Sequence, residues 1–485
     1  MNLFATKSVD QLMAEGGDGS HGSGNSDLKR TLGAMQLVAL GIGAVVGAGI
    51  YVLAGTAAAN HAGPAVVYSF ILAAIGCALA GLCYSEFSTM IPIAGSAYAY
   101  SYATLGELVA WIIGWALVLE YAVGAATVSV GWSGTMVSIL KSLGITLPQQ
   151  FLASPWDADP GLVNLPAVFI IVVITAILIR GVQESARFNS IVVAVKLTVV
   201  IAFIVLGYSY INTGNYTPFL PENTTGEFGK FGWTGVMSAA GTIFFAYIGF
   251  DAVSTAAQEA KNPKRDMPIG IIGSLAVCTM LYIMYALVLT GIVNYKELNV
   301  AAPYALAVDR MTGLPWLGFW MKLGSLLGLT TVMLAMLFGQ SRVFYSMSKD
   351  GLLPKTFSEI HPTLRTPYKS NLILLVFVGL LAGFTPISLL GNLTSIGTLC
   401  AFIVVCIGVI VLRRTRPELP RPFRTPMVPL IPALGVLANF ALMYSLDSLT
   451  WTAFLAWMAF GLVIYFSYSA SRSHLQKAAA RSSGR

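Results

Sequence analysis

The residues of this chain that could do chemistry are a few charged side chains set within long apolar segments. A charge at membrane depth is costly, so such a residue is usually paired or functional. The candidates are Glu86, Glu107, Glu120, Lys196, Asp251 and Arg342. Three of them, Glu86, Glu107 and Arg342, lie near segment ends, where a long side chain can reach water or headgroups. We therefore expect structural roles for these three.

Lys196 differs because apolar residues surround it on both sides, at 191–195 and 197–200. A lysine buried there either pairs with an anion or with carbonyl oxygens, or gives up its proton. A lysine that gives up and regains its proton could carry a proton cycle. The alternative is a permanently charged lysine that holds helices together.

Glu120 and Asp251 are the two acidic candidates. Glu120 lies in the middle of its apolar segment, where it could face a cationic ligand or pair with serine and threonine hydroxyls; the sequence leaves both open. Asp251 follows Gly249 and could cap a half-helix that begins there. We favour this structural role over direct ligand contact.

A glycine-rich stretch is the element that we expect to position these charged side chains around a site. Residues 41–51 hold four glycines, and each costs a helix about 1 kcal/mol relative to alanine, which predicts a break near Gly43. Unwound backbone at membrane depth survives only where protein surrounds it or where it lines a wet cavity. A half-helix starting near Gly47 would offer N–H groups to an anion, and one ending near Ala44 would offer carbonyls to a cation. A zwitterion such as an amino acid needs both, although close helix packing through small residues is the competing explanation.

A second weak point lies at residues 244–251, where Gly249 and Asp251 interrupt an apolar, aromatic-rich segment. The aromatic side chains are by default helix packing. Beside a broken helix, a ring can also cover a small solute as a lid.

The composition predicts an all-α polytopic membrane protein. Of the 485 residues, 56% are apolar and 10% charged, well below the charge of soluble proteins. The histidines lie outside the apolar segments and the cysteines have no metal-type spacing, so we expect no metal site and no enzyme activity. The net charge of +7 indicates membrane topology rather than nucleic-acid binding.

Apolar windows of about 20 residues predict twelve transmembrane helices. They fall at 34–58, 65–85, 98–139, 163–182, 190–212, 231–257, 268–293, 316–346, 370–388, 391–412, 427–447 and 450–470. Most of the 28 lysines and arginines flank these windows on one side, which predicts that both termini are cytoplasmic. The two weak points lie in windows one and six, which cross the membrane in opposite directions. We therefore expect two inverted five-helix repeats, each beginning with an interrupted helix.

This division gives five parts. A flexible cytoplasmic N-terminus (1–33) precedes the first repeat (34–212), the second repeat (231–412), two peripheral helices (427–470) and a cytoplasmic tail (471–485). The N-terminus has no apolar core typical of a cleavable signal.

Several motifs carry a family resemblance. Residues 41–50, 245–251, 258–268 and 341–354 together resemble the amino acid, polyamine and organocation transporter superfamily. Residues 91–100, 184–189 and 421–426 narrow the resemblance to bacterial members of the cationic amino acid transporter family. The resemblance implies the leucine-transporter fold, with helices 1 and 6 broken.

The resemblance also implies site residues. The substrate carboxylate would bind the amides of Gly47, Ala48 and Gly49, and the substrate amine the carbonyls of Val45, Phe245 and Ile248. Phe245 would also act as a gate, and Lys196 would couple transport to protons. For the pocket that holds the substrate side chain, the sequence suggests Glu120, Ser325 and Leu327.

The expected function is proton-coupled import of L-amino acids by alternating access, with protons as the coupling ion and no other cofactor. Exchange without net proton flow is the first alternative, and a transporter-like amino acid receptor the second. The charge preference for the substrate stays open. The expected surroundings are a bacterial plasma membrane, and a small membrane subunit is a possible partner.

Overall fold

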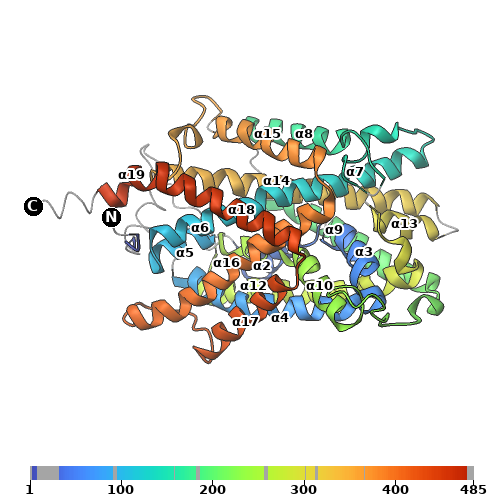
Figure 1. Ribbon diagram of the computed structural model, residues 1–485, viewed down its shortest axis with the longest axis horizontal. Helices are drawn as coiled ribbons and strands as arrows, with labels where there is room; N and C mark the ends of the chain where they lie inside the picture. Colours follow the sequence, from blue (N-terminus) through green and yellow to red (C-terminus); the bar gives the residue numbers. More distant parts are fainter. Residues whose placement is uncertain are drawn as a thin grey trace, which may run out of the picture.

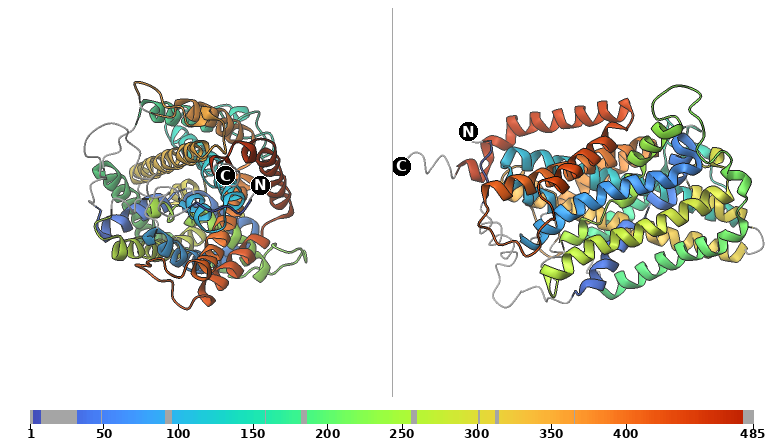
Figure 2. Two further views of the ribbon diagram at one scale, coloured as in Figure 1. Left: turned by 90° about the vertical axis from the view of Figure 1, so that its left-hand side faces the viewer. Right: turned by 90° about the horizontal axis from the view of Figure 1, so that it is seen from below.

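The computed structural model describes residues 3–7, 32–47, 49–90, 96–157, 159–181, 186–255, 260–300, 302–311, 315–364 and 366–477. The described residues form helices that run side by side along the long axis of the molecule (Figures 1 and 2). They contain no strand, only an isolated bridge between Leu32 and Ala260.

Two crossings are interrupted. The first consists of α2 (Ala34–Val45) and, after a gap, the helical segments η1 (Gly49–Leu53), α3 (Ala54–Ala57) and η2 (Ala58–Ala62). The second consists of α10 (Gly232–Ile243), η8 (Phe244–Tyr247) and α11 (Ala252–Thr255).

The other main helices surround these crossings. They are α4 (Val66–Met90), α5 (Ser96–Thr104), α6 (Glu107–Val118), η4 (Leu119–Val123), α7 (Gly124–Ser142), α8 (Leu165–Arg180), α9 (Ala186–Gly207), α12 (Pro263–Ile292), α13 (Pro303–Arg310), α14 (Pro315–Lys349), α15 (Tyr368–Phe384), α16 (Ile387–Thr415), α17 (Leu430–Tyr444), α18 (Ser448–Ile464) and α19 (Ala470–Arg472). The half-helix α2 packs against α12 and α9, and α14 packs against α7 and α9.

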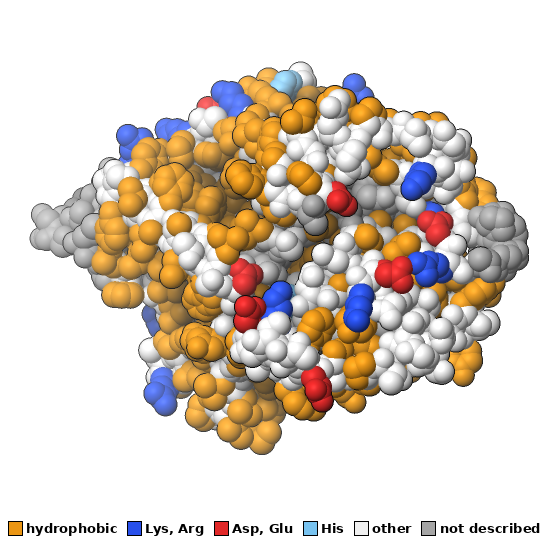
Figure 3. Space-filling model, turned by 45° about the vertical axis from the view of Figure 1, so that its right-hand side comes forward, with side chains coloured by type: hydrophobic (Ala, Val, Ile, Leu, Met, Phe, Trp, Pro, Cys, Tyr) orange, Lys and Arg blue, Asp and Glu red, His pale blue; other side chains and the backbone are white. Residues whose placement is uncertain are grey.

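Seven helical runs among the described residues are long and apolar enough to cross a membrane. They are Gly49–Met90, Glu107–Ser142, Ile191–Tyr210, Pro263–Ile292, Gly318–Lys349, Ile387–Thr415 and Ser448–Arg472. Four shorter apolar helices accompany them: Ala34–Val45, Leu165–Arg180, Tyr368–Phe384 and Leu430–Tyr444. Hydrophobic side chains cover much of the flank in Figure 3. The protein is therefore a polytopic, all-helical membrane protein.

The third predicted window, 98–139, is not one helix. The chain turns between α5 and α6 at Gly106, whose φ of 95° is rarely adopted by other residues. A β-carbon on Gly106 would lie 2.6 Å from the backbone of Phe4. A contact with the distant N-terminal segment thus requires glycine here, which the local apolar pattern does not reveal.

Residues 3–7, 98–108, 347–352 and 465–474 meet at one end of the bundle, and we call this assembly the terminal clasp (Figure 1). The Lys7 ammonium lies 2.5 Å from the Asp350 carboxylate, and both side chains are about nine-tenths buried. The hydroxyl of Tyr98 donates to the same carboxylate. Residues 3–7 belong to the segment 1–33 predicted to be flexible, yet Leu3, Ala5 and Lys7 have defined hydrogen-bond partners. Residues 8–31 lie outside the described part.

Glu107 is the second buried acid of the terminal clasp. Its carboxylate accepts hydrogen bonds from the hydroxyls of Tyr102, Tyr465 and Ser473. The amide N–H groups of Glu107 and Leu108 donate to the carbonyls of Ala5 and Leu3. These partners suit the structural role predicted for Glu107, but the expectation that its side chain reaches water or headgroups is wrong, because the side chain is fully buried.

Glu86 has structural partners too. Its carboxylate forms a two-point ion pair with Arg413 of α16, at 3.0 and 2.7 Å, and lies 3.4 Å from Arg421. It also accepts the backbone N–H of Thr425. This cluster joins α4 to α16 and to the segment after α16. Arg342 stacks on the ring of Phe338, 4.0 Å away.

Candidate functional site

The first break begins at the last residue of α2, Val45. Val46 is extended (ψ 103°), and helical structure resumes at Gly49. The carbonyl of Gly47 accepts the N–H groups of Ile50 and Tyr51 at 3.2 and 3.3 Å. Ala48, a predicted carboxylate-binding residue, lies outside the described residues.

The second break follows η8. Ile248 is extended (ψ 136°), and Gly249 has φ 111° before helical structure resumes at Ala252. A β-carbon on Gly249 would lie 2.9 Å from the carbonyl oxygen of Ala44, so only glycine fits this conformation and contact. Gly249 thus lies within the second break.

The two breaks touch each other. A β-carbon on Gly49 would lie 2.1 Å from Cα of Ala246, so there is no room for any side chain at position 49. Val45, Phe245 and Ile248, whose carbonyls the resemblance assigns to a substrate amine, are all buried. The glycine at position 49 therefore allows the unwound segments to meet, and it brings the predicted binding residues into one region.

Lys196 reaches the first break from α9. Its side chain is buried, and its ammonium donates to the carbonyl of Gly43 at 2.7 Å. Gly43 lies in the last turn of α2, and its carbonyl lies beyond the carbonyl of Ile42, the last one to accept a backbone N–H before the gap. The side chain of Lys196 passes Gly328 of α14, where a β-carbon would lie 3.2 Å from it. The sequence predicted pairing with carbonyls, but not which carbonyl.

The buried acids lie near the second break. One oxygen of Asp251 accepts the hydroxyl of Tyr121, 3.1 Å away, in the π-helical segment η4. Glu120 occupies the preceding position in η4, is fully buried and interacts electrostatically with Asp251. Asp251 thus connects the second break to another crossing. Helix capping by Asp251 and ligand contact by Glu120 stay predictions.

The predicted pocket wall on α14 is partly wrong. Leu327 is half exposed on the outer surface, and the buried hydroxyl of Ser325 donates to the carbonyl of Lys322 within its own helix. The α14 side chain that reaches the first break is Val332, whose Cγ2 would lie 2.9 Å from a β-carbon on Gly47. Met336, one turn further, lies beside Gly124 of α7. Gly328, Val332 and Met336 share one face of α14 at four-residue spacing.

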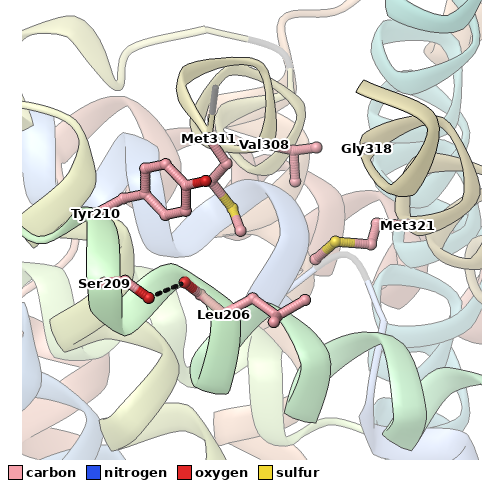
Figure 4. A pocket seen from close by; sticks show the side chains of 7 residues that line it. All are labelled: Leu206, Ser209, Tyr210, Val308, Met311, Gly318 and Met321. Atoms are coloured by element: carbon pink, nitrogen blue, oxygen red, sulfur yellow. Dashed lines mark hydrogen bonds between the residues drawn. The ribbon is translucent and has the colours of Figure 1, made fainter. Parts of the chain in front are cut away.

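A cavity of about 120 Å³ lies away from the breaks, between the end of α9, α13 and the start of α14 (Figure 4). It is lined by Leu206, Ser209, Tyr210, Val308, Met311, Gly318 and Met321. The hydroxyl of Ser209 donates to the carbonyl of Leu206, 3.1 Å away. None of these residues belongs to either break, so this cavity is separate from the site.

The arrangement is typical of a membrane transporter: two interrupted helices meet inside a bundle and present backbone groups rather than a catalytic set. In the described part of the chain, no group of histidine, cysteine and acidic residues could hold a metal ion. Comparison with known proteins agrees with this class. The sequence profile of the amino acid permease family matches residues 32–473, and the chain belongs to this family, within the amino acid, polyamine and organocation superfamily.

Three relatives of the chain have names that differ in the solute they transport. The chain is 45% identical to the branched-chain amino acid permease BcaP of Bacillus subtilis (strain 168), over 98% of this chain and 99% of that protein. It is 44% identical to the methylthioribose transporter of the same organism, over 98% and 100%. It is 38% identical to the vacuolar cationic amino acid transporter 4 of Arabidopsis thaliana, over 86% and 68%.

Proposed function

We propose that the protein is a secondary transporter that imports L-amino acids together with protons. In this proposal twelve transmembrane helices form two inverted five-helix repeats, and the site between the broken helices opens to one side of the membrane at a time. The observation that carries the proposal is the contact between the two breaks, with the Lys196 ammonium on a carbonyl beside one of them.

The two ends of an amino acid would bind backbone groups of opposite polarity. The carboxylate would accept N–H groups of residues 47–49, at the positive end of the half-helix that starts at Gly49. The ammonium would donate to carbonyls of Val45, Phe245 and Ile248. Phe245 would then cover the bound substrate as a lid.

The substrate side chain would face α14. Val332 and Met336 are apolar and lie beside glycines of the neighbouring crossings, which favours a neutral side chain of small or medium size. One relative is named a branched-chain amino acid permease, which agrees with such a pocket. Glu120 would be the residue that accommodates a cationic side chain, so leucine and arginine are the informative pair of substrates.

Coupling to protons would act through Lys196. A charged ammonium on the carbonyl of Gly43 holds the last turn of α2 against α9. Loss of the proton weakens this bond and lets α2 move, so the proton biases which side of the membrane the site faces. The protein would lie in a bacterial plasma membrane with both termini in the cytoplasm, a proposal that rests on the distribution of its lysines and arginines.

Purified protein in lipid vesicles tests the proposal. Uptake of labelled leucine, alanine, arginine and methylthioribose should be measured with an imposed pH gradient and without one. We expect the gradient to drive accumulation of at least one neutral amino acid. Accumulation that needs internal amino acid and ignores the gradient would identify an exchanger instead. Methylthioribose transport without amino acid transport would refute the substrate assignment.

Replacing Lys196 with methionine separates coupling from transport. Lys196→Met should abolish gradient-driven accumulation while counterflow exchange of labelled for unlabelled substrate persists. Lys141→Met is the matched control, because Lys141 is exposed at the end of α7. Undiminished uphill uptake by Lys196→Met would refute the coupling role.

A further inference from the structure

Tyr282 of α12 contacts both breaks with one hydroxyl group. Its side chain is buried, and its hydroxyl oxygen lies 2.9 Å from the carbonyl of Val45 and 2.9 Å from the carbonyl of Ala246. Val45 ends the half-helix before the first break, and Ala246 lies in the 3-10 turn before the second. One side chain from a third helix therefore connects two segments that are far apart in the sequence.

The ring of Tyr282 is held firmly in this position. It packs against Phe70 and Tyr247, with ring centroids 5.5 and 5.4 Å away. The hydroxyl of Tyr247 in turn donates to the carbonyl of Phe70, 3.0 Å away. The position of the Tyr282 hydroxyl is thus set by the aromatic packing.

A phenol has a single proton to donate, yet the Tyr282 hydroxyl has two carbonyl acceptors at equal distance. At any moment it satisfies only one of them, and the other can accept a hydrogen bond from another donor. A substrate ammonium carries three N–H donors, and Val45 is one of its proposed acceptors. The ammonium and the tyrosine therefore meet at the same carbonyl.

We infer that Tyr282 is a positioning residue for the substrate ammonium. When the ammonium donates to Val45, the tyrosine proton turns to Ala246, so that binding of the amine strengthens the bond between α12 and the second break. An amine at the first break thus changes the hydrogen bonding of Ala246, which is next to Phe245 in the chain. This inference rests on the proposed function, because it needs an ammonium at Val45.

Tyr285 provides a matched control on the same helix. It is equally buried, and its ring packs 4.8 Å from that of Phe203 and 6.3 Å from that of Tyr304. In the part of the chain that the structure describes, its hydroxyl has no hydrogen-bond partner. Replacing Tyr285 with phenylalanine thus removes the same atom as the change at Tyr282 but breaks no bond.

The experiment compares Tyr282→Phe with Tyr285→Phe in vesicles, using labelled L-leucine. Loss of one buried hydrogen bond that organises the site should raise the KM for leucine about three- to tenfold in Tyr282→Phe and change kcat by less than about twofold. Tyr285→Phe should match the unmodified protein in both. Tyr282→Leu, which also lacks the hydroxyl, should raise KM at least as much as Tyr282→Phe.

The outcomes separate this inference from the proposed function. If the unmodified protein takes up no amino acid, the proposed function fails. If it takes up leucine and neither variant at position 282 changes KM, only the role of Tyr282 fails. A lower melting temperature with unchanged KM would mean that the hydroxyl serves folding alone. Failure of both variants to fold, while Tyr285→Phe folds, would also overturn the inference.

Discussion

Replacing Asp350 with asparagine should release residues 3–7 from the terminal clasp. The substitution keeps the size of the side chain and its ability to accept the hydroxyl of Tyr98, but it removes the negative charge that Lys7 contacts at 2.5 Å. Because both side chains are about nine-tenths buried, water does not screen this pair as it screens a surface pair.

The magnitude follows from the bonds that hold the segment. Ordering five residues costs about 5–10 kcal/mol, at 1–2 kcal/mol for each backbone. Three backbone hydrogen bonds, from the N–H groups of Lys7, Glu107 and Leu108, offset roughly 2–4 kcal/mol of this cost. Docking therefore depends on the ion pair and on burial. Losing a charged hydrogen bond worth about 1.5–3 kcal/mol should shift the equilibrium between docked and undocked segment about 10- to 150-fold.

Hydrogen exchange of the purified protein measures this shift directly. The amides of Glu107 and Leu108 donate to carbonyls of residues 5 and 3, so they lose protection when the segment leaves. Peptides that cover 105–110 should exchange about 10- to 100-fold faster in Asp350→Asn. The matched control is Glu359→Gln, the same acid-to-amide change in the exposed pair with Lys369. Unaltered exchange at Glu107 and Leu108 in Asp350→Asn would refute the view that the ion pair holds this segment.

Two further predictions concern packing. Gly49→Ala should abolish uptake in vesicles, because the new β-carbon would lie 2.1 Å from the backbone of the second break; Gly379→Ala, with no atom closer than 4.0 Å, should retain uptake, and active Gly49→Ala would disprove the contact between the breaks. Arg413→Met should lower the free energy of unfolding by about 1.5–3 kcal/mol, the worth of a charged hydrogen bond, since the buried carboxylate of Glu86 loses its two-point partner but keeps Arg421. Thermal unfolding of the purified variant measures this loss. The control Arg416→Met, at an exposed position, should have the stability of the unmodified protein.

Both breaks were predictable from the sequence because the weakness of a helix is local. Glycines at 41, 43, 47 and 49 lower helix stability wherever the segment lies, and the structure places the gap after Val45. Gly249 was predictable for the same reason. A lysine amid apolar residues likewise demands a polar partner, whichever fold surrounds it.

The partners themselves were not predictable, because they depend on distant packing. The sequence does not indicate that Lys196 would find Gly43, 153 residues earlier, or that Tyr282 would find Val45, 237 residues earlier. The orientation of α14 was also missed at Leu327. The helix carries apolar residues on all sides, so its pattern does not distinguish the side that faces lipid from the side that faces the breaks.

The terminal clasp has a consequence for biosynthesis. Glu107 is made early and inserted with α6, but Tyr465 and Ser473, two of its three hydroxyl donors, leave the ribosome more than 350 residues later. Until then its carboxylate lacks these two hydrogen bonds, and the terminal clasp is incomplete. A truncated polypeptide would keep this defect permanently, which offers cellular quality control a way to tell it from a completed one.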